Sequence, residues 1–250
     1  MLGLRNVMIA SWVFGASVTA VNAAPPRIAM TLPLGIPPGA TTKVTLRGWD
    51  FDKATEVRVS EGRAAVKLVG QGNAAVPDKF DAKKVGDRQV EVEISAPAEP
   101  GSAVLALSVV TPEGVSEPRE IWVGGELPVV AEKEPNNGLR QPQPVAIGQL
   151  VDGAIQNPLD TDVYAIEGTA GQRLSVEILA HRRGQALDAT LTLFDDRLAI
   201  LASNDDQTDT VDPRVELTLP MTGRFMIVVA DAHDRGGPLN QYRLQIRHRP

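Results

Sequence analysis

Apolar and polar residues alternate over many short segments in the first half of the chain. The clearest is "QVEVEIS", in which Val90, Val92 and Ile94 point to one side and the glutamates to the other. This period of two is typical of a β-strand with one buried face. Further strands are expected at residues 43–48, 56–60, 65–69, 103–110 and 120–124. Turn signals such as "PPG", "EPG" and "PEG" separate them, so the pattern predicts an antiparallel sandwich of six or seven strands in about 100 residues.

The second half gives eight more strand candidates in succession. They are residues 145–151, 162–167, 173–179, 189–195, 198–203, 214–219, 224–230 and 242–246. Eight short antiparallel strands suit a jelly-roll sandwich, and neither half shows a convincing amphipathic helix. We therefore expect an all-β protein with two tandem antiparallel sandwiches. The first would occupy residues 25–126 and the second, a jelly roll, residues 127–250, joined through "GGELPVVAEKE".

The first residues have the pattern of a signal peptide. Arg5 supplies a positive start, residues 7–21 form an apolar core, and "NAA" suits cleavage near Ala23. The apolar run is short for a bilayer span, so residues 1–24 predict export to the periplasm, the cell surface or the medium of a bacterium, with retention as an N-terminal anchor as the alternative. No other segment is apolar enough to cross a membrane, so no span is expected after signal cleavage.

Composition excludes several classes of function. The chain has no cysteine, which excludes disulfides, lipoprotein attachment at a cysteine and thiol catalysis. The formal net charge is −6, and the excess of acid is concentrated from residue 127 onward, with 12 basic and 17 acidic residues. A nucleic-acid partner requires a basic surface, so none is expected.

One acidic segment at the centre of the chain could bind a cation. In "AEKEPNNG" Glu132, Glu134 and Asn136 alternate, so an extended chain presents them on one side, and Asn137 adds another oxygen. Calcium prefers six to eight hard oxygen ligands, and Asp160 and Asp162 in "LDTD" could supply missing carboxylates. The alternative is a plain polar linker, because asparagine and aspartate favour turns and glutamate is common in exposed segments.

Other polar clusters are weaker candidates. The acidic segment at residues 203–212 lacks the central glycine and final glutamate of an EF-hand loop, so it is expected to be a solvated loop, with a weak second calcium site as the alternative. Asp231, His233 and Asp234 could bind zinc, but no fourth ligand is evident. The sequence has no nucleophile elbow, zinc-protease helix or phosphate-binding loop, so we expect no enzyme.

Carbohydrate binding is a competing expectation, because jelly rolls include lectins. Sugar sites usually present exposed aromatic rings. Phe194, Phe225, Tyr164 and Tyr242 of the second half all lie within strand patterns, where a role in the core is expected. The mature chain has two tryptophans, Trp49 and Trp122, and both belong to the first half.

A family resemblance adds to these expectations. The segments "EKEPNNGLRQPQPV", "GAIQNPLDTDVYAI", "AGQRLSVEI", "LTLFDDRLAILASNDD" and "LTLPMTGRFMIVV" follow one another in order over residues 132–246. Together they resemble the bacterial pre-peptidase C-terminal (PPC) domain, which is usually found behind the catalytic domain of secreted peptidases. The related collagen-binding modules of clostridial collagenases share a Glu-x-Glu-x-Asn start that chelates calcium and orders the linker before it. The resemblance thus implies a structural Ca²⁺ held by Glu132, Glu134, Asn136, Asn137, Asp160 and Asp162, with the two acidic segments side by side.

The first half has a looser resemblance. Residues 33–59, "PLGIPPGATTKVTLRGWDFDKATEVRV", are similar to the opening of an IPT/TIG-type immunoglobulin-like domain. Such modules mostly act as spacers or interaction domains. Because the residues before Glu132 have the pattern of a sandwich and not of a peptidase, the resemblance implies an accessory role without peptidase activity. We expect a secreted or periplasmic, non-catalytic binding protein whose partner is an extracytoplasmic protein or polysaccharide, and the alternatives are a carbohydrate-binding module or an accessory subunit of a secreted peptidase.

Overall fold

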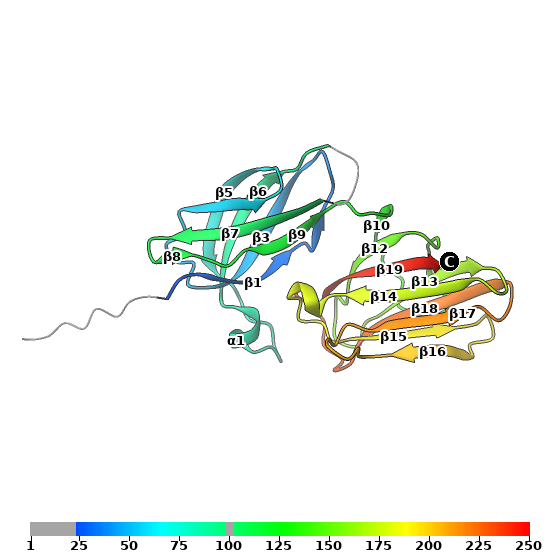
Figure 1. The fold of residues 1–250 in the computed structure, drawn as a ribbon. Helices are drawn as coiled ribbons and strands as arrows, with labels where there is room; N and C mark the ends of the chain where they lie inside the picture. Colours follow the sequence, from blue (N-terminus) through cyan, green and yellow to red (C-terminus); the bar gives the residue numbers. More distant parts are fainter. Residues whose placement is uncertain (1–23, 99–102) are drawn as a thin grey trace, which may run out of the picture.

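The computed structural model describes residues 24–98 and 103–250, which form two β-sandwiches (Figure 1). The signal-peptide prediction lies outside the described residues, apart from Ala24. Among the residues described, no helix has the length and apolar character needed to span a membrane.

The first sandwich packs two sheets face to face. One has the order β1-β3-β6-β5 and the other β2-β9-β7-β4, with β8 paired to β7. Val44 and Leu46 of β3 lie opposite Val92 and Val90 of β6, and all four are fully buried. The strands are β1 (Arg27–Leu32), β2 (Gly35–Ile36), β3 (Thr41–Trp49), β4 (Glu56–Glu61), β5 (Ala65–Asn73), β6 (Arg88–Ser95), β7 (Ala103–Thr111), β8 (Gly114–Val115) and β9 (Arg119–Val123).

The second sandwich has two five-stranded sheets, ordered β10-β12-β19-β14-β17 and β11-β13-β18-β15-β16. Its core lies between the sheets, and the strands at the centre, β19 and β18, contribute buried residues such as Leu244 and Ile227. The strands are β10 (Val129–Ala131), β11 (Gln143–Pro144), β12 (Leu150–Ala154), β13 (Thr161–Gly168), β14 (Arg173–Leu179), β15 (Ala189–Phe194), β16 (Ile200–Asn204), β17 (Arg214–Thr218), β18 (Gly223–Asp231) and β19 (Gln241–Arg249).

The prediction of an all-β chain with two tandem antiparallel sandwiches is confirmed. The main difference lies at residues 145–151, where a strand was expected from the first residue. The chain instead turns at Gly148, whose φ of 94° favours glycine, and β12 begins only at Leu150. The domain boundary between residues 126 and 127 stays a prediction.

Two short helices join the strands. The four-residue α1 (Ala82–Val85) begins after Asp81, whose Oδ1 accepts a hydrogen bond from the Lys83 backbone N–H. The 3₁₀-helix η1 (His181–Arg183) follows β14. Figure 1 shows that both lie near the seam between the two sandwiches.

The two sandwiches are joined by side-chain contacts as well as by the chain. The Trp122 ring of the first is stacked between the guanidinium groups of Arg183 and Arg243 of the second, at 4.5 and 4.3 Å from its centroid. Gln185 Nε2 donates a hydrogen bond to the Thr31 carbonyl oxygen at 2.9 Å. These contacts fix the face that the second sandwich presents to the first.

Candidate metal centre

Three carboxylates gather where the chain enters the second sandwich. Glu132, Glu134 and Asp162 each offer an oxygen, and these oxygens lie within 4.8 Å of one another. Glu132 follows β10 directly, and its backbone N–H donates to the Asp152 carbonyl at 2.9 Å, which continues the parallel pairing of β10 with β12. Asp162 lies in β13. The cluster therefore brings together the connection between the domains and a central strand.

Asn136 closes this group through a folded loop, not through an extended chain. Its Nδ2 donates to Glu132 Oε1 at 3.1 Å, and its backbone N–H donates to Glu134 Oε2 at 2.8 Å. The Asn136 carbonyl accepts a hydrogen bond from the Val163 N–H at 3.0 Å, which fastens the loop to β13. The structure thus brings Glu132, Glu134, Asn136 and Asp162 together.

The other two residues of the expected site have different roles. Asp160 accepts hydrogen bonds from the Gln156 N–H at 2.7 Å and from the Thr161 N–H at 3.0 Å, so it closes its own turn. Asn137 is exposed, and its Oδ1 accepts a hydrogen bond from the Asn136 N–H. Neither residue belongs to the group of close carboxylates.

Two tyrosines line the cluster, although the sequence assigned them to the core. Tyr164 Oη donates to Glu132 Oε1 at 3.0 Å, and Tyr242 Oη donates to Asp162 Oδ2 at 2.5 Å, while the two hydroxyls lie 2.6 Å apart. A Cβ at Gly153 would lie 2.8 Å from the Tyr242 hydroxyl, so the glycine makes room for the pair. Asp162 and Tyr164 alternate along β13, and this spacing was the one sequence signal that could have placed a tyrosine beside the carboxylates.

Burial governs the electrostatics of the cluster. Asp162 is fully buried, and its burial together with the neighbouring negative charge of Glu132 raises its pKa to about 9. Burial, followed by the charges of Glu132 and Asp162, also raises the pKa of Tyr164 far above its usual range. At neutral pH and without a cation, Asp162 therefore holds a proton and the tyrosine remains a neutral donor.

Two buried oxygens of the cluster have no hydrogen-bond donor among the described residues. They are Asp162 Oδ1 and Asn136 Oδ1, and both side chains are 0% exposed. A buried acceptor without a donor costs free energy, and a cation beside it would recover that cost. Carboxylate and amide oxygens without histidine or cysteine suit calcium and not zinc. The residues present therefore fit a hard divalent cation.

In the other acidic clusters, hydrogen-bond donors already contact the carboxylate oxygens. Asp231 accepts hydrogen bonds from the backbone N–H groups of His233 and Arg235 and from the Arg235 guanidinium. Asp212, at the end of the acidic loop, is fully buried and accepts from the backbone N–H groups that begin η1. Across residues 24–98 and 103–250, the carboxylate group around Glu132 is the single cluster with the composition and spacing of a metal site.

A comparison with family models matches residues 160–231 to the bacterial pre-peptidase C-terminal domain. This stretch of the second sandwich is similar to the PPC domain. The matched range runs from the start of β13 to the end of β18 and confirms the resemblance seen in the sequence. It includes Asp162 but not the segment from Glu132 to Asn136.

Solved structures resemble the chain only distantly. The pre-peptidase C-terminal domain of the Bacillus anthracis collagenase is 13% identical, and the match covers 46% of this chain and 100% of that one, with a TM-score of 0.35. The periplasmic inhibitor of g-type lysozyme from Aeromonas hydrophila is 17% identical over 43% of this chain and 96% of its own, with a TM-score of 0.33. The CBM51-2 and INT domains of Clostridium perfringens ZmpB, in complex with GlcNAc, are 12% identical over 82% and 44%, with a TM-score of 0.28. No curated protein sequence matches the chain, and these scores carry no argument about function.

Proposed function

We propose that the chain is a secreted or periplasmic, non-catalytic binding or accessory protein whose interdomain junction is ordered by Ca²⁺. The observation that carries the proposal is the group of three close carboxylates beside the Asn136 amide, where the buried Asp162 Oδ1 and Asn136 Oδ1 have no donor in the described part of the chain. A PPC domain is an accessory part of secreted peptidases, which supports an extracytoplasmic location and a non-catalytic role.

The proposed ion would be held by Glu132, Glu134, Asp162 and the Asn136 side-chain oxygen. It would supply positive charge that offsets three carboxylates, and Asp162 would lose its proton when the ion binds. Because Glu132 continues β10 and Asp162 belongs to β13, the ion would tie the connection between the domains to the second sandwich. Its role would be to order this connection.

The calcium part of the proposal is tested by thermal unfolding. Calcium added after EDTA treatment should raise the melting temperature, and at 100 times the dissociation constant it should stabilise the fold by about 2.7 kcal/mol. Glu134→Gln should remove most of this response. Glu167→Gln is the matched control, because Glu167 is an exposed glutamate on β13 outside the cluster. If neither EDTA nor calcium changes the melting temperature of the wild-type protein, the calcium site is refuted.

The absence of catalysis is tested separately. The protein should not degrade casein in the presence or absence of calcium. Turnover of casein that is lost in the His233→Ala variant would show that the protein is an enzyme. The proposed activity is instead binding to an extracytoplasmic protein or polysaccharide. The second candidate is a role as the accessory subunit of a secreted peptidase, which the PPC match supports.

A further inference from the structure

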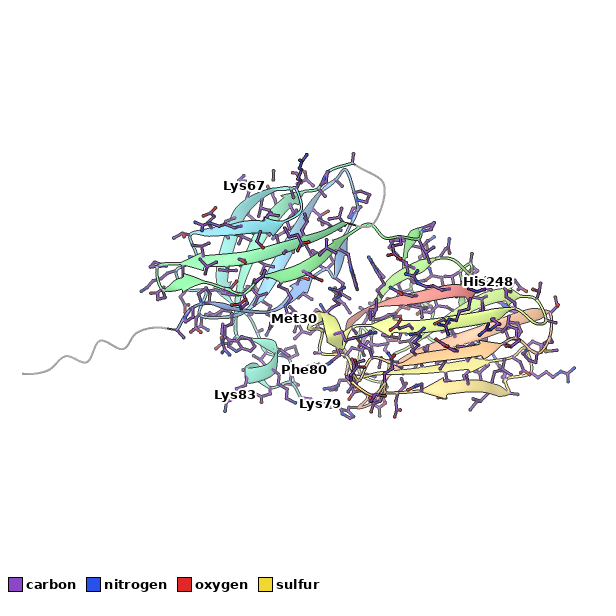
Figure 2. The ribbon with its side chains drawn as sticks, viewed as in Figure 1. Met30, Lys67, Lys79, Phe80, Lys83 and His248 are labelled. Carbon is purple, nitrogen blue, oxygen red and sulfur yellow. The ribbon has the colours of Figure 1, made fainter. Side chains whose placement is uncertain are left out.

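A cavity of about 690 Å³ lies between the two sandwiches, away from the carboxylate cluster. Met30, Trp49 and Phe80 line it from the first domain, and Gln185 and Asp188 line it from the second. Figure 2 places Met30 and Phe80 at this seam. Cavities between domains are frequent ligand sites, and this volume is sufficient for a small molecule.

The lining carries cations that have no acidic partner. Lys79, Lys84 and Arg119 border the cavity, and none of them forms an ion pair within the described part of the chain. One of the two acidic groups in the lining, Asp188, lies 3.4 Å from His233 Nε2. In a chain whose net charge is −6, this local excess of positive charge favours an anionic ligand.

Arg119 is a partly buried cation of the lining. Its Nη2 donates to the Ile28 carbonyl oxygen at 3.2 Å, and burial together with the nearby Arg183 lowers its pKa. A carbonyl oxygen does not neutralise a guanidinium that has lost much of its water, so an anion in the cavity would stabilise it.

Gln185 adds an unused acceptor to the same lining. Its side chain is 2% exposed and its Nε2 is bound to the Thr31 carbonyl, but its Oε1 has no donor among the described residues. Buried polar atoms are rarely left without a partner. Because Oε1 has almost no accessible surface, a ligand in the cavity does not reach it, and the Gln185 amide serves to join the two sandwiches.

Two aromatic rings give the cavity apolar walls. Trp49 is held by a hydrogen bond from its Nε1 to the Ala82 carbonyl at 2.9 Å, and Phe80 lies close by; both are partly exposed. One face of each ring already carries a guanidinium, because Arg27 lies over Trp49 at 4.6 Å and Arg235 over Phe80 at 5.5 Å, so a sugar would pack its C–H face against the other face. Strand addition by a peptide is disfavoured, because Arg119 and Gln185 already occupy carbonyl oxygens on the β1 edge.

We propose that this interdomain cavity binds an acidic saccharide. Its carboxylate would accept hydrogen bonds from Arg119, Lys79 and Lys84, and a ring face would lie against Trp49 or Phe80. The inference rests on the proposed binding role and names the class of ligand.

The test is calorimetric titration of the full chain, in a buffer that contains calcium, with trimers of galacturonate and of glucuronate. At least one trimer should bind, and Lys79→Gln with Lys84→Gln should weaken that binding by about tenfold or more. Lys83→Gln is the control, because Lys83 lies beside Lys84 on α1 but does not line the cavity. Figure 2 shows Lys79 on the side of this segment that faces the second sandwich and Lys83 on the other side.

Three results would overturn the proposal. They are equal binding of neutral galactotriose, equal binding of a tetraglutamate peptide, and no binding of either acidic trimer. Equal weakening by Lys83→Gln would also overturn it, because the effect would then reflect general charge. The calcium response of the melting temperature should be the same in the double lysine variant and in Lys83→Gln as in the wild type, so failure at the cavity and failure at the carboxylate cluster can be told apart.

Discussion

Two aspartates of the second sandwich are equally buried but differ in what surrounds them. Asp212 is 0% exposed and accepts hydrogen bonds from the backbone N–H groups of Ala180, His181 and Arg182, and from Arg182 Nε at 2.9 Å. Asp162 is also 0% exposed, yet Tyr242 is its hydrogen-bond donor at one oxygen and the other oxygen has none among the described residues.

The difference shows that the supply of donors, and not burial alone, decides the state of a buried carboxylate. Burial raises the pKa of Asp231, but hydrogen bonds from the Arg235 side chain and from the backbone outweigh it and leave this pKa below its usual value. The pKa of Asp162 moves the other way, because Glu132 adds negative charge and few donors oppose it. Asp212 and Asp231 receive hydrogen bonds from several donors, whereas Asp162 requires a proton or a cation.

The largest effect on stability is expected from removing the Asp212 carboxylate. Asp212→Ala leaves three backbone N–H groups without their acceptor, whereas Arg182 keeps Glu177 and the Ile178 carbonyl as acceptors, so the free energy of unfolding should fall by about 3 kcal/mol. Urea denaturation measures this change, and calcium should not alter it. Asp209→Ala is the control, because Asp209 is an exposed aspartate of the same loop and should change the stability by less than about 0.5 kcal/mol.

Removal of the Asp162 carboxylate should have a different effect on stability. Asp162→Asn replaces a buried carboxyl, which must take up a proton on folding, with a neutral amide, so without metal the free energy of unfolding should stay the same or rise. The variant should, however, lose the stabilisation of about 2.7 kcal/mol that calcium gives at 100 times its dissociation constant. Urea titrations in EDTA and in calcium separate the two effects, and a strong loss of stability in EDTA would contradict the comparison.

The contributions of Asp162 and Asp231 to stability should change with pH in opposite directions. Between the ordinary aspartate pKa of 3.8 and about 9, the folded metal-free protein holds a proton on Asp162 that the unfolded chain has released. Its contribution to stability is therefore present at low pH and declines as pH rises, by at most about 1.4 kcal/mol per pH unit. The contribution of Asp231, whose pKa is lowered, is present above the ordinary aspartate pKa and is lost as pH falls.

Calcium should cancel the decline attributed to Asp162, because the bound form has already lost this proton. The gain in melting temperature on adding calcium should consequently grow from pH 5.5 to pH 8.5, roughly the range in which Asp162 alone must be deprotonated by the metal. Thermal unfolding at matched ionic strength measures it. An equal gain at both pH values would show that Asp162 does not ligate the ion.

The smallest effect concerns the tyrosines. Tyr242→Phe removes the donor to Asp162 Oδ2 and the contact with the Tyr164 hydroxyl, but it keeps the ring in the core. The expected loss is about 1 kcal/mol in the free energy of unfolding, as for a single hydrogen bond. The variant should retain its calcium response, and chemical denaturation in EDTA and in calcium provides the measurement.

Sequence patterns predicted most of the fold because alternation is a local property. Strand β6 was expected at 89–95 and β14 at 173–179, close to their observed bounds. Strand β1, "RIAMTL", was missed because four successive residues from Ile28 to Thr31 are buried, so no alternation is visible. The helix α1 was missed because four residues cannot show a helical period.

The carboxylate cluster was predictable in part for the same reason. The alternation of Glu132, Glu134 and Asn136 indicated a shared face, but it did not indicate the loop that carries the Asn136 amide back to Glu132. The Tyr242 hydroxyl lies 80 positions from Asp162 along the chain, and only the packing of the sheet that holds β19 against the sheet that holds β13 brings it there. The interdomain cavity depends on contacts between separate domains, for which one sequence has no local signal.

The stacking of Trp122 between Arg183 and Arg243 has a consequence for how the molecule moves in water. The rings and guanidinium groups interlock the two sandwiches, and the pairing of β10 with β12 makes the connection part of a sheet. The molecule should thus tumble as one elongated particle, and nuclear spin relaxation of both domains should fit a single anisotropic diffusion tensor. A molecule bound to one sandwich would then be held at a fixed orientation relative to the other.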